Sequence, residues 1–186
     1  RVGVDILEVN VSCPNTNCDD EFDKTEVVLE YISNNFINKR EKHIPVIVKF
    51  SLDTKMYEIP FLLDLLIEKK FDGVNFGNTS KDYKRLRSKI NPNERELFNF
   101  FTTTFGGGIS GKPLKELSLE LCKNAIAYKK VISPSREFHI IRTGGIECWE
   151  DIHKSLQLGV SLCQWFTGYF DYFSRYGHNV YKELYE

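Results

Sequence analysis

Residues 46–76, VIVKFSLDTKMYEIPFLLDLLIEKKFDGVNF, contain a complete strand–helix–strand unit. The apolar runs at 46–50 and 73–76 are continuous instead of alternating, which is typical of strands buried on both faces of a sheet. Between them, Leu62 and Leu66 recur at helical spacing after Pro60, a residue that is tolerated in the first turn of a helix. A helix between two buried strands predicts that the strands run parallel and are joined by a right-handed crossover.

The same alternation of strand and helix extends over the whole chain. Further continuous apolar runs predict strands at 6–11, 138–142 and 162–166. Helices are predicted around apolar residues at helical spacing and over one shorter segment: Val28, Ile32 and Phe36; Leu114, Leu117, Leu121 and Ile126; residues 151–158; and Tyr176, Val180 and Leu184. Strands separated by helices predict a single α/β unit built on a parallel sheet.

Length and charge exclude several classes of protein. The chain has 186 residues, which is enough for one domain but short of the roughly 250 that eight strands and eight helices need. With 25 Lys and Arg against 26 Asp and Glu, the net charge is −1, so nothing supports binding to nucleic acid. No apolar run approaches the ~20 residues of a membrane span, and the first residues lack the apolar core of a signal peptide.

Cysteine use predicts a reducing compartment, such as the cytoplasm. The five cysteines are odd in number and irregularly spaced, which does not fit a disulfide framework. Cys13 and Cys18 have no further Cys or His at zinc-site spacing, so we expect no metal site. Cys122, Cys148 and Cys163 are interpreted as small buried apolar residues.

The stretch 80–105 is too long for an ordinary loop between a strand and a helix. It is polar and aromatic and carries six basic residues: Lys81, Lys84, Arg85, Arg87, Lys89 and Arg95. A solvated insertion accounts for these charges, and an active-site lid is the alternative.

Polar residues and glycines follow every predicted strand. These are residues 12–16, Lys49, residues 77–79, residues 143–145 and residues 167–168. Because the carboxyl ends of parallel strands meet at one edge of the sheet, we expect them to form a shared site. The glycine clusters at 106–108, 144–145 and 168 present bare backbone N–H groups and together predict a phosphate-bearing cofactor. No G-x-G-x-x-G follows a strand, so the pattern is not a dinucleotide fingerprint.

Six motifs, in this order and at fitting intervals, resemble the dihydroorotate dehydrogenase family. They are residues 10–16 (NVSCPNT), 48–49 (VK), 78–79 (NT), 107–114 (GGISGKPL), 143–146 (TGGI) and 164–167 (QWFT). The resemblance covers nearly the whole chain, and its most specific parts are 10–16 and 107–114. The family is an FMN-containing (β/α)8 barrel, a TIM barrel, that oxidises dihydroorotate to orotate in pyrimidine synthesis.

The resemblance implies that this chain supplies about the last five βα units of such a barrel. Residues 1–186 would then be the C-terminal portion of a single FMN-binding barrel domain, with the first three strands not present. A five-stranded arc cannot close on itself, so we expect its two edges to be unpaired within this chain.

The resemblance also implies roles for particular residues. Cys13 matches the catalytic base that removes the proton, since a modest shift of a thiol pKa gives thiolate at neutral pH. The matches to substrate-binding positions are Asn10, Asn15, Asn78 and Thr79. The matches to flavin-binding positions are Lys49, Ser110, Gly111, Gly144, Gly145, Phe166 and Thr167. A cation at Lys49 would stabilise the negative charge of reduced flavin.

Features of two classes of the family occur together. Cys13 is similar to the soluble class 1, whereas residues 110–114 (SGKPL) are similar to the quinone-linked class 2. The electron acceptor is therefore fumarate, NAD through a partner subunit, or quinone, and a homodimer is compatible with each. A soluble enzyme would be cytoplasmic, and a quinone-linked one would associate with the mitochondrial inner membrane or the bacterial plasma membrane.

Two departures from the family leave alternatives open. Residues 17–21 (NCDDE) are acidic where the family carries a glycine and a basic element, and Trp165 and Phe166 are bulkier than the usual pair. One alternative is a catalytically degenerate barrel that acts as a structural or interaction subunit. Another is a flavoenzyme similar to dihydropyrimidine dehydrogenase, which has His where this chain has Asn15. A third, a flavin-free phosphate-binding barrel, is opposed by Lys49 and Cys13.

Overall fold

A computed structural model describes residues 3–11 and 21–185 of the chain. Five parallel strands form one sheet in the order β1-β2-β3-β4-β5, so consecutive strands are neighbours throughout. The strands are β1 Leu7–Asn10, β2 Val46–Phe50, β3 Gly73–Phe76, β4 His139–Thr143 and β5 Leu162–Gln164. The prediction of five parallel strands is confirmed, and β1 and β5 form the two edges of the arc.

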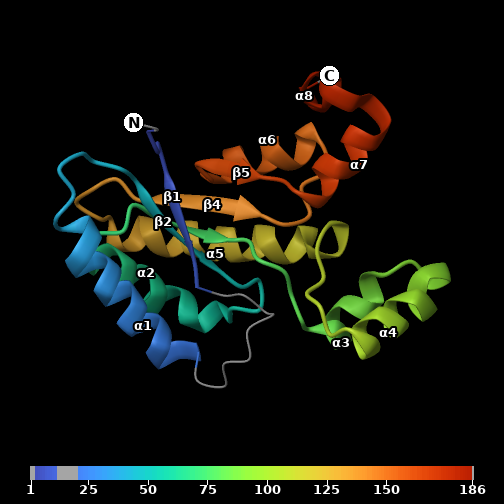
Figure 1. Cartoon of the computed structure of the whole chain (residues 1–186), viewed down its shortest axis with the longest axis horizontal. Coiled ribbons are helices and arrows are strands. Elements are labelled where there is room, and N and C mark those ends of the chain that lie inside the picture. Colours follow the sequence, from blue (N-terminus) through green and yellow to red (C-terminus); the bar gives the residue numbers. More distant parts are fainter. Residues whose placement is uncertain (1–2, 12–20, 186) are drawn as a thin grey trace.

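Helices connect successive strands and cover one face of the sheet. The α-helices are α1 Glu21–Ile32, α2 Ile59–Glu68, α3 Tyr83–Leu86, α4 Arg95–Thr104, α5 Lys115–Ile132, α6 Trp149–Leu158, α7 Thr167–Tyr176 and α8 Val180–Tyr185. A π-helix at Ser33–Ile37 continues α1, and short 3-10 turns lie at Met56–Glu58, Arg87–Lys89, Pro92–Glu94, Lys112–Leu114 and Gly177–Asn179. In Figure 1, α1, α2 and α5 lie on the same side of the strands. None of the described helices is long and apolar enough to cross a membrane.

The core lies between the sheet and these helices. The central strands contribute Val46, Val48, Val74 and Ile140, and the helices contribute the four leucines of α2 together with Leu117 and Leu121 of α5, all buried. The predicted stripe Leu114, Leu117, Leu121 and Ile126 is buried as a set. Fully burying such a side chain stabilises the fold by about 1.5–3 kcal/mol relative to leaving it exposed.

Of the three apolar residues that predict the first helix, Ile32 packs against the core, whereas Val28 and Phe36 lie on the exposed side. Val28 and Phe36 are 44% and 36% exposed, and the buried face is formed instead by Leu29, Ser33 and Ile37. The Ser33 hydroxyl donates to the Lys69 carbonyl oxygen at 2.8 Å, which satisfies a polar group facing α2. Hydrophobic spacing does not identify Ser33 as buried, because serine is polar.

The predicted closing helix is two helices. The α7 helix ends at Tyr176, and Gly177 has a φ of +56°, a left-handed conformation that favours glycine. A 3-10 turn then leads into α8. The strand predicted at 162–166 also ends early, at Gln164, because Phe166 already begins the turn into α7.

The insertion 80–105 folds into a helical arm made of α3 and α4. Paired backbone hydrogen bonds between Ser80 and Ile109 close its base, and the arm projects away from the sheet (Figure 1). Its basic residues are mostly exposed, as expected of a solvated insertion, yet α4 also exposes Leu97, Phe100 and Phe101. The lid alternative stays a prediction.

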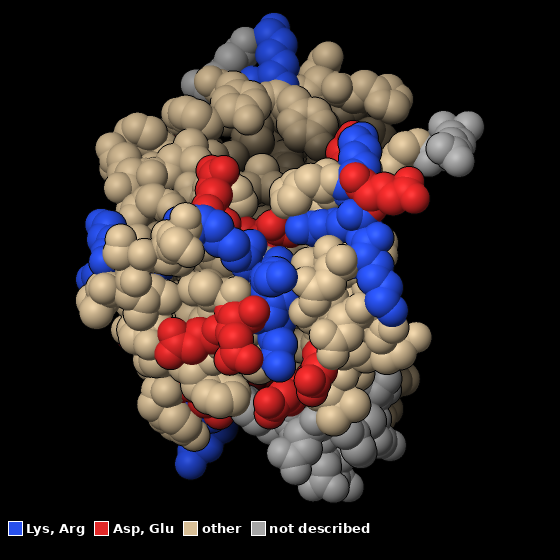
Figure 2. Space-filling view, turned by 90° about the vertical axis from the view of Figure 1, so that its left-hand side faces the viewer, with Lys and Arg blue, Asp and Glu red and all other residues tan. Residues whose placement is uncertain are grey.

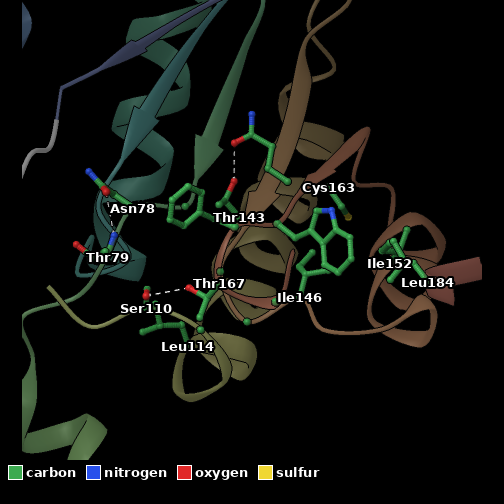
Figure 3. Close-up of a pocket in the computed structure, with 18 of the residues that line it drawn as sticks. Asn78, Thr79, Ser110, Leu114, Thr143, Ile146, Ile152, Cys163, Thr167 and Leu184 are labelled. Carbon is green, nitrogen blue, oxygen red and sulfur yellow. Dashed lines mark hydrogen bonds between the residues drawn. The ribbon is translucent and has the colours of Figure 1, made fainter. Parts of the chain in front are cut away.

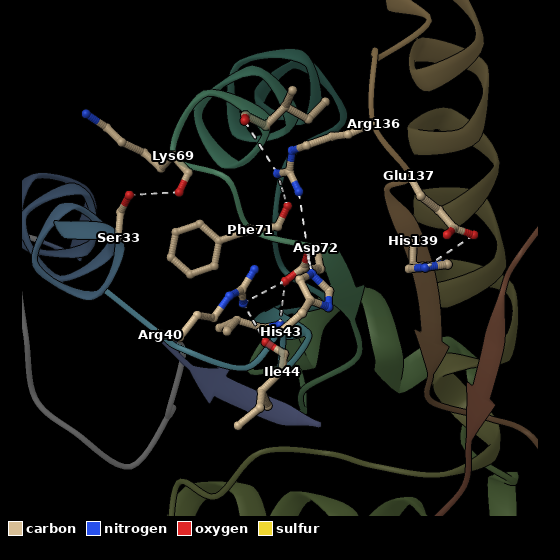
Figure 4. Close-up of polar contacts among 12 residues, drawn as sticks. Ser33, Arg40, His43, Ile44, Lys69, Phe71, Asp72, Arg136, Glu137 and His139 are labelled. Atoms are coloured by element: carbon tan, nitrogen blue, oxygen red, sulfur yellow. Dashed lines mark hydrogen bonds and ion pairs between the residues drawn. The ribbon is translucent and has the colours of Figure 1, made fainter. Parts of the chain in front are cut away.

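A buried carboxylate joins the amino-terminal ends of the central strands. The Asp72 carboxylate accepts the Val46 backbone N–H at 2.8 Å and lies 3.2–3.4 Å from donor nitrogens of Arg40, His43 and Arg136. Figure 4 shows Arg40 and His43, from the loop before β2, and Arg136, from the segment before β4, converging on Asp72. Because one acid connects the loop before β2, the start of β3 and the segment before β4, this cluster holds the amino-terminal ends of these three strands together. Figure 2 views the side that is on the left in Figure 1, and acidic and basic side chains are interspersed on its surface.

Candidate functional site

A pocket of about 660 Å³ opens at the carboxyl ends of the strands. Its lining includes nine of the residues that the sequence predicts for ligand binding: Lys49, Asn78, Thr79, Ser110, Gly111, Gly144, Gly145, Phe166 and Thr167. Figure 3 shows Asn78, Thr79, Ser110 and Thr167 at one end of the pocket and the apolar Ile152 and Leu184 at the other. The structure therefore brings together residues from five separate segments, as expected of a shared site.

The remaining predicted residues stand differently. Asn10 ends β1, and its Oδ1 accepts a hydrogen bond from Asn78 Nδ2 at 3.1 Å, so two predicted substrate-binding amides are adjacent. Asn78 Oδ1 also accepts the backbone N–H of Thr79 at 3.0 Å, which fixes the orientation of this amide. Cys13 and Asn15 lie outside the described residues, so their roles stay predictions.

Backbone geometry at two glycines suits a phosphate. Gly144 and Gly145 have φ of +114° and +68°, and a Cβ at Gly145 would lie 2.3 Å from the Lys115 backbone nitrogen. Only glycine therefore lets the loop after β4 lie against the start of α5. Together with the cation of Lys49 and the mutually hydrogen-bonded hydroxyls of Ser110 and Thr167, 2.9 Å apart, this lining fits an anionic cofactor.

A buried arginine supports the glycine loop from behind. Arg142 is 1% exposed, and its Nε donates to Ser118 Oγ at 2.9 Å while Ser118 Oγ lies 2.7 Å from the Gly144 carbonyl oxygen. Its other nitrogens donate to Ser155 and to the Lys115 carbonyl oxygen. Arg142 was predicted only as the last residue of a strand. Its position as a cation at the end of an apolar run is the sequence signal that could have marked it, and the same signal marked Lys49.

Asp151 holds the turn between β4 and α6. It accepts the Glu147 backbone N–H at 3.1 Å and the Lys115 ammonium at 2.9 Å, and it is 6% exposed. Burial raises the pKa of its carboxyl, but the hydrogen bonds from Lys115, Glu147 and Cys148 outweigh burial and hold that pKa below its ordinary value.

The lowered pKa of Asp151 predicts a loss of stability in acid. Its contribution is complete above the unfolded pKa of about 3.9 and is lost as the pH falls through the lower folded pKa. We expect the unfolding free energy of the full-length protein to fall less steeply with acidification in D151N than in wild type. Urea titrations at pH 6, 5, 4 and 3 measure this slope, and parallel slopes for the two proteins would contradict the assignment.

A network of hydrogen-bonded polar side chains centred on Glu8 lies on the inner face of the sheet. The Glu8 carboxylate accepts hydrogen bonds from Lys49 Nζ at 3.0 Å, Asn75 Nδ2 at 2.8 Å and Gln164 Nε2 at 3.0 Å. Thr143 Oγ1 lies within 3.0 Å of the side-chain oxygens of Asn75 and Gln164, and its single hydroxyl hydrogen points between these two acceptors. Each of the five strands supplies one member, so the sheet is curved enough for β1 and β5, its two edges, to contact each other through side chains.

Glu8 and Asn75 have no predicted role. Both lie within runs that are interpreted as buried strands. The sequence of one strand does not show which residue of another strand its side chains face across the interior. The available signal was an ionisable or amide side chain inside an apolar run. Gly77 supports this arrangement, since a Cβ there would lie 2.2 Å from Thr143 Cβ.

Parallel βα units, a pocket at the carboxyl ends of the strands and a glycine loop after β4 define the class. The chain is part of an α/β barrel with its ligand site at the carboxyl end of the strands. A family model described as dihydroorotate dehydrogenase matches residues 2–186. The chain belongs to the dihydroorotate dehydrogenase family.

Individual relatives agree with this assignment. The chain is 31% identical over 168 residues to the dihydroorotate dehydrogenase (quinone) of Kineococcus radiotolerans, covering 89% of this chain and 42% of that protein. It is 30% identical over 186 residues to that of a Shewanella species, covering 97% of this chain and 49% of that protein. The chain thus spans about half the length of the curated relatives it matches.

Solved structures show the same fold. A crystal structure of DHODH from Eimeria tenella in complex with ferulenol matches with a TM-score of 0.71 at 21% sequence identity. The match covers 97% of this chain and 48% of that one. The prediction of a TIM barrel, of which this chain supplies a part, is confirmed.

Proposed function

We propose that the protein is an FMN-dependent dihydroorotate dehydrogenase that oxidises dihydroorotate to orotate in pyrimidine synthesis and passes the electrons to quinone. The observation that carries the proposal is the joint lining of one pocket by Lys49, Asn78, Thr79, Ser110 and Thr167 beside the glycine loop. Membership of the family supports the activity, and each of these positions lies in a sequence motif that resembles one of the family's.

Amide side chains bind the substrate in this proposal. Orotate is a planar ring whose N–H and C=O groups alternate, and an amide both donates and accepts. The Asn10–Asn78 pair supplies two such groups 3.1 Å apart at the carboxyl ends of β1 and β3, and Asn15 supplies a third. Thr79 adds a hydroxyl at the same end of the pocket.

Lys49, Ser110, Gly111 and Thr167 would bind the flavin, with Phe166 beside its phosphate and the backbone of 144–145 cradling that phosphate. When bound, FMN supplies the two-electron acceptor for the hydride of dihydroorotate. Lys49 is suited to stabilising negative charge, because its side chain is only 22% exposed and its charge is therefore weakly screened.

Cys13 is proposed to take the proton from the carbon next to the carbonyl of dihydroorotate. A thiol has an ordinary pKa of about 8.5, so a modest decrease provides thiolate at neutral pH. The C–H electron pair at the neighbouring carbon leaves as hydride, the ring gains a C=C bond, and Cys13 returns its proton to solvent. This assignment rests on the match of residues 10–16 to the family motif.

Quinone is favoured over fumarate and NAD as the acceptor. The relatives reported above are named as quinone enzymes, and residues 110–114 match the motif of that class. A quinone-linked enzyme works at the surface of a respiratory membrane, which is the location we propose.

Steady-state oxidation of dihydroorotate by the full-length protein tests this proposal. We expect turnover with a short-chain ubiquinone and none above background with fumarate or NAD⁺. The surface variant E120Q, altered at an exposed residue, serves as the control and should match wild type. Turnover with fumarate or NAD⁺ alone would contradict the quinone assignment, and no turnover with any acceptor would contradict the activity.

A further inference from the structure

Glu8 is an acid between two apolar residues of β1, Leu7 and Val9, and it lies directly against the cation of the pocket. Its Oε1 is 3.0 Å from Lys49 Nζ, and the side chains of both residues are 22% exposed. Desolvating a carboxylate is costly unless it is paired and hydrogen-bonded. Here it accepts three hydrogen bonds, which suits the charged form because a carboxylate can only accept.

The surrounding amides fix the position of that charge. Asn75 Nδ2 and Gln164 Nε2 both point at Glu8 Oε2, and the Thr143 hydroxyl orients the two amide oxygens away from it. Burial raises the pKa of the Glu8 carboxyl, but the hydrogen bonds and the charge of Lys49 outweigh burial and lower the pKa below its ordinary value. Glu8 is therefore ionised at neutral pH.

We infer that Glu8 is a positioning residue that holds Lys49 and offsets its charge, so that this pair carries no net charge and the flavin is harder to reduce. The inference rests on the proposed function, because it concerns the cofactor that this pocket would bind. It assigns to Glu8 a role in setting the reduction potential that neither the sequence motifs nor the pocket lining include.

The charges of Glu8 and Lys49 determine the direction in which each variant shifts the flavin midpoint potential. Reduction adds negative charge to the flavin, so a nearby cation raises the midpoint potential and a nearby anion lowers it. Wild type pairs one of each. E8Q removes the carboxylate beside Lys49 and should raise the potential, and K49M removes the ammonium beside Glu8 and should lower it. The double variant E8Q/K49M restores a neutral pair and should return close to the wild-type potential.

The experiment measures flavin content and midpoint potential of the full-length protein after reconstitution with FMN, in wild type and in the three variants. E8L serves as a second neutral variant in case E8Q does not fold, since it fills the space with an apolar side chain. It should shift the potential in the same direction as E8Q. Q157N, altered at an exposed position of α6, is the matched control and should leave the potential unchanged.

Failure of this inference can be distinguished from failure of the proposed function. A positive shift in E8Q or E8L that is cancelled by K49M supports the role of Glu8. Flavin bound in all variants at one common potential overturns the role of Glu8 and leaves the proposed function standing. A folded wild-type protein that retains no FMN overturns both.

Discussion

Replacement of Cys13 by alanine is expected to leave flavin bound and to slow its reduction by dihydroorotate by about 10²–10⁴-fold. This is the usual contribution of a general base that takes a proton in the rate-limiting step. Anaerobic stopped-flow absorbance at the flavin band measures the rate directly. Because C13A removes only the sulfur, the flavin content should equal that of wild type.

Two further variants sharpen the test of Cys13. C13S should keep part of the rate, because the other class of the family has serine at this position. C148A is the control: this thiol is half-buried outside the pocket lining, and burial raises its pKa, so it does not act as a base. Normal flavin reduction in C13A, or an equal loss in C148A, would refute the assignment of Cys13.

The second large effect is a loss of unfolding free energy, and it is expected at the Asp72 cluster, at the amino-terminal ends of the central strands. D72N removes the negative charge that Arg40, His43 and Arg136 contact (Figure 4). Removing one partner of a buried ion pair costs about 3–5 kcal/mol, because the remaining charges lose their compensation. Since Arg136 is 31% exposed, we expect a loss in unfolding free energy near the lower limit, about 3 kcal/mol.

Chemical denaturation of the full-length protein measures this loss. The exposed pair of Arg85 and Glu120 provides the control, because both side chains are more than half exposed, at 55% and 56%. E120Q should change the unfolding free energy by less than about 1 kcal/mol. If D72N were as small in effect as E120Q, the cluster would not hold the ends of the strands together.

Much of the fold could be predicted because local sequence and tertiary burial agree. The strands at 46–50 and 73–76 have the predicted bounds, since each is a continuous apolar run ended by a polar residue or a glycine. The prediction failed where a buried position is polar, as at Ser33, or where one backbone angle changes the path of the chain, as at Gly177. Neither event alters hydrophobic periodicity, which was the main signal used.

The residues that line the site at the strand ends could be predicted, whereas the polar residues behind them, in the interior of the sheet, could not. Residues at strand ends, such as Lys49 and Thr167, were found because parallel strands bring their carboxyl ends to one edge. Glu8 and Asn75 were missed because their partners lie on other strands, across the interior of the arc. That contact depends on sheet curvature, which no single strand encodes. The base assigned to Cys13 rests on motif resemblance and lies outside the described residues.

Anaerobic addition of dihydroorotate to the full-length protein, followed by visible absorption, tests the central claim most directly. We predict a flavin band that bleaches as orotate forms, which would establish cofactor, substrate and the reductive half-reaction together. A flavin band that persists would contradict dihydroorotate as the substrate and favour another pyrimidine. A folded protein without a flavin band would contradict the enzyme assignment and favour a structural relative of the family.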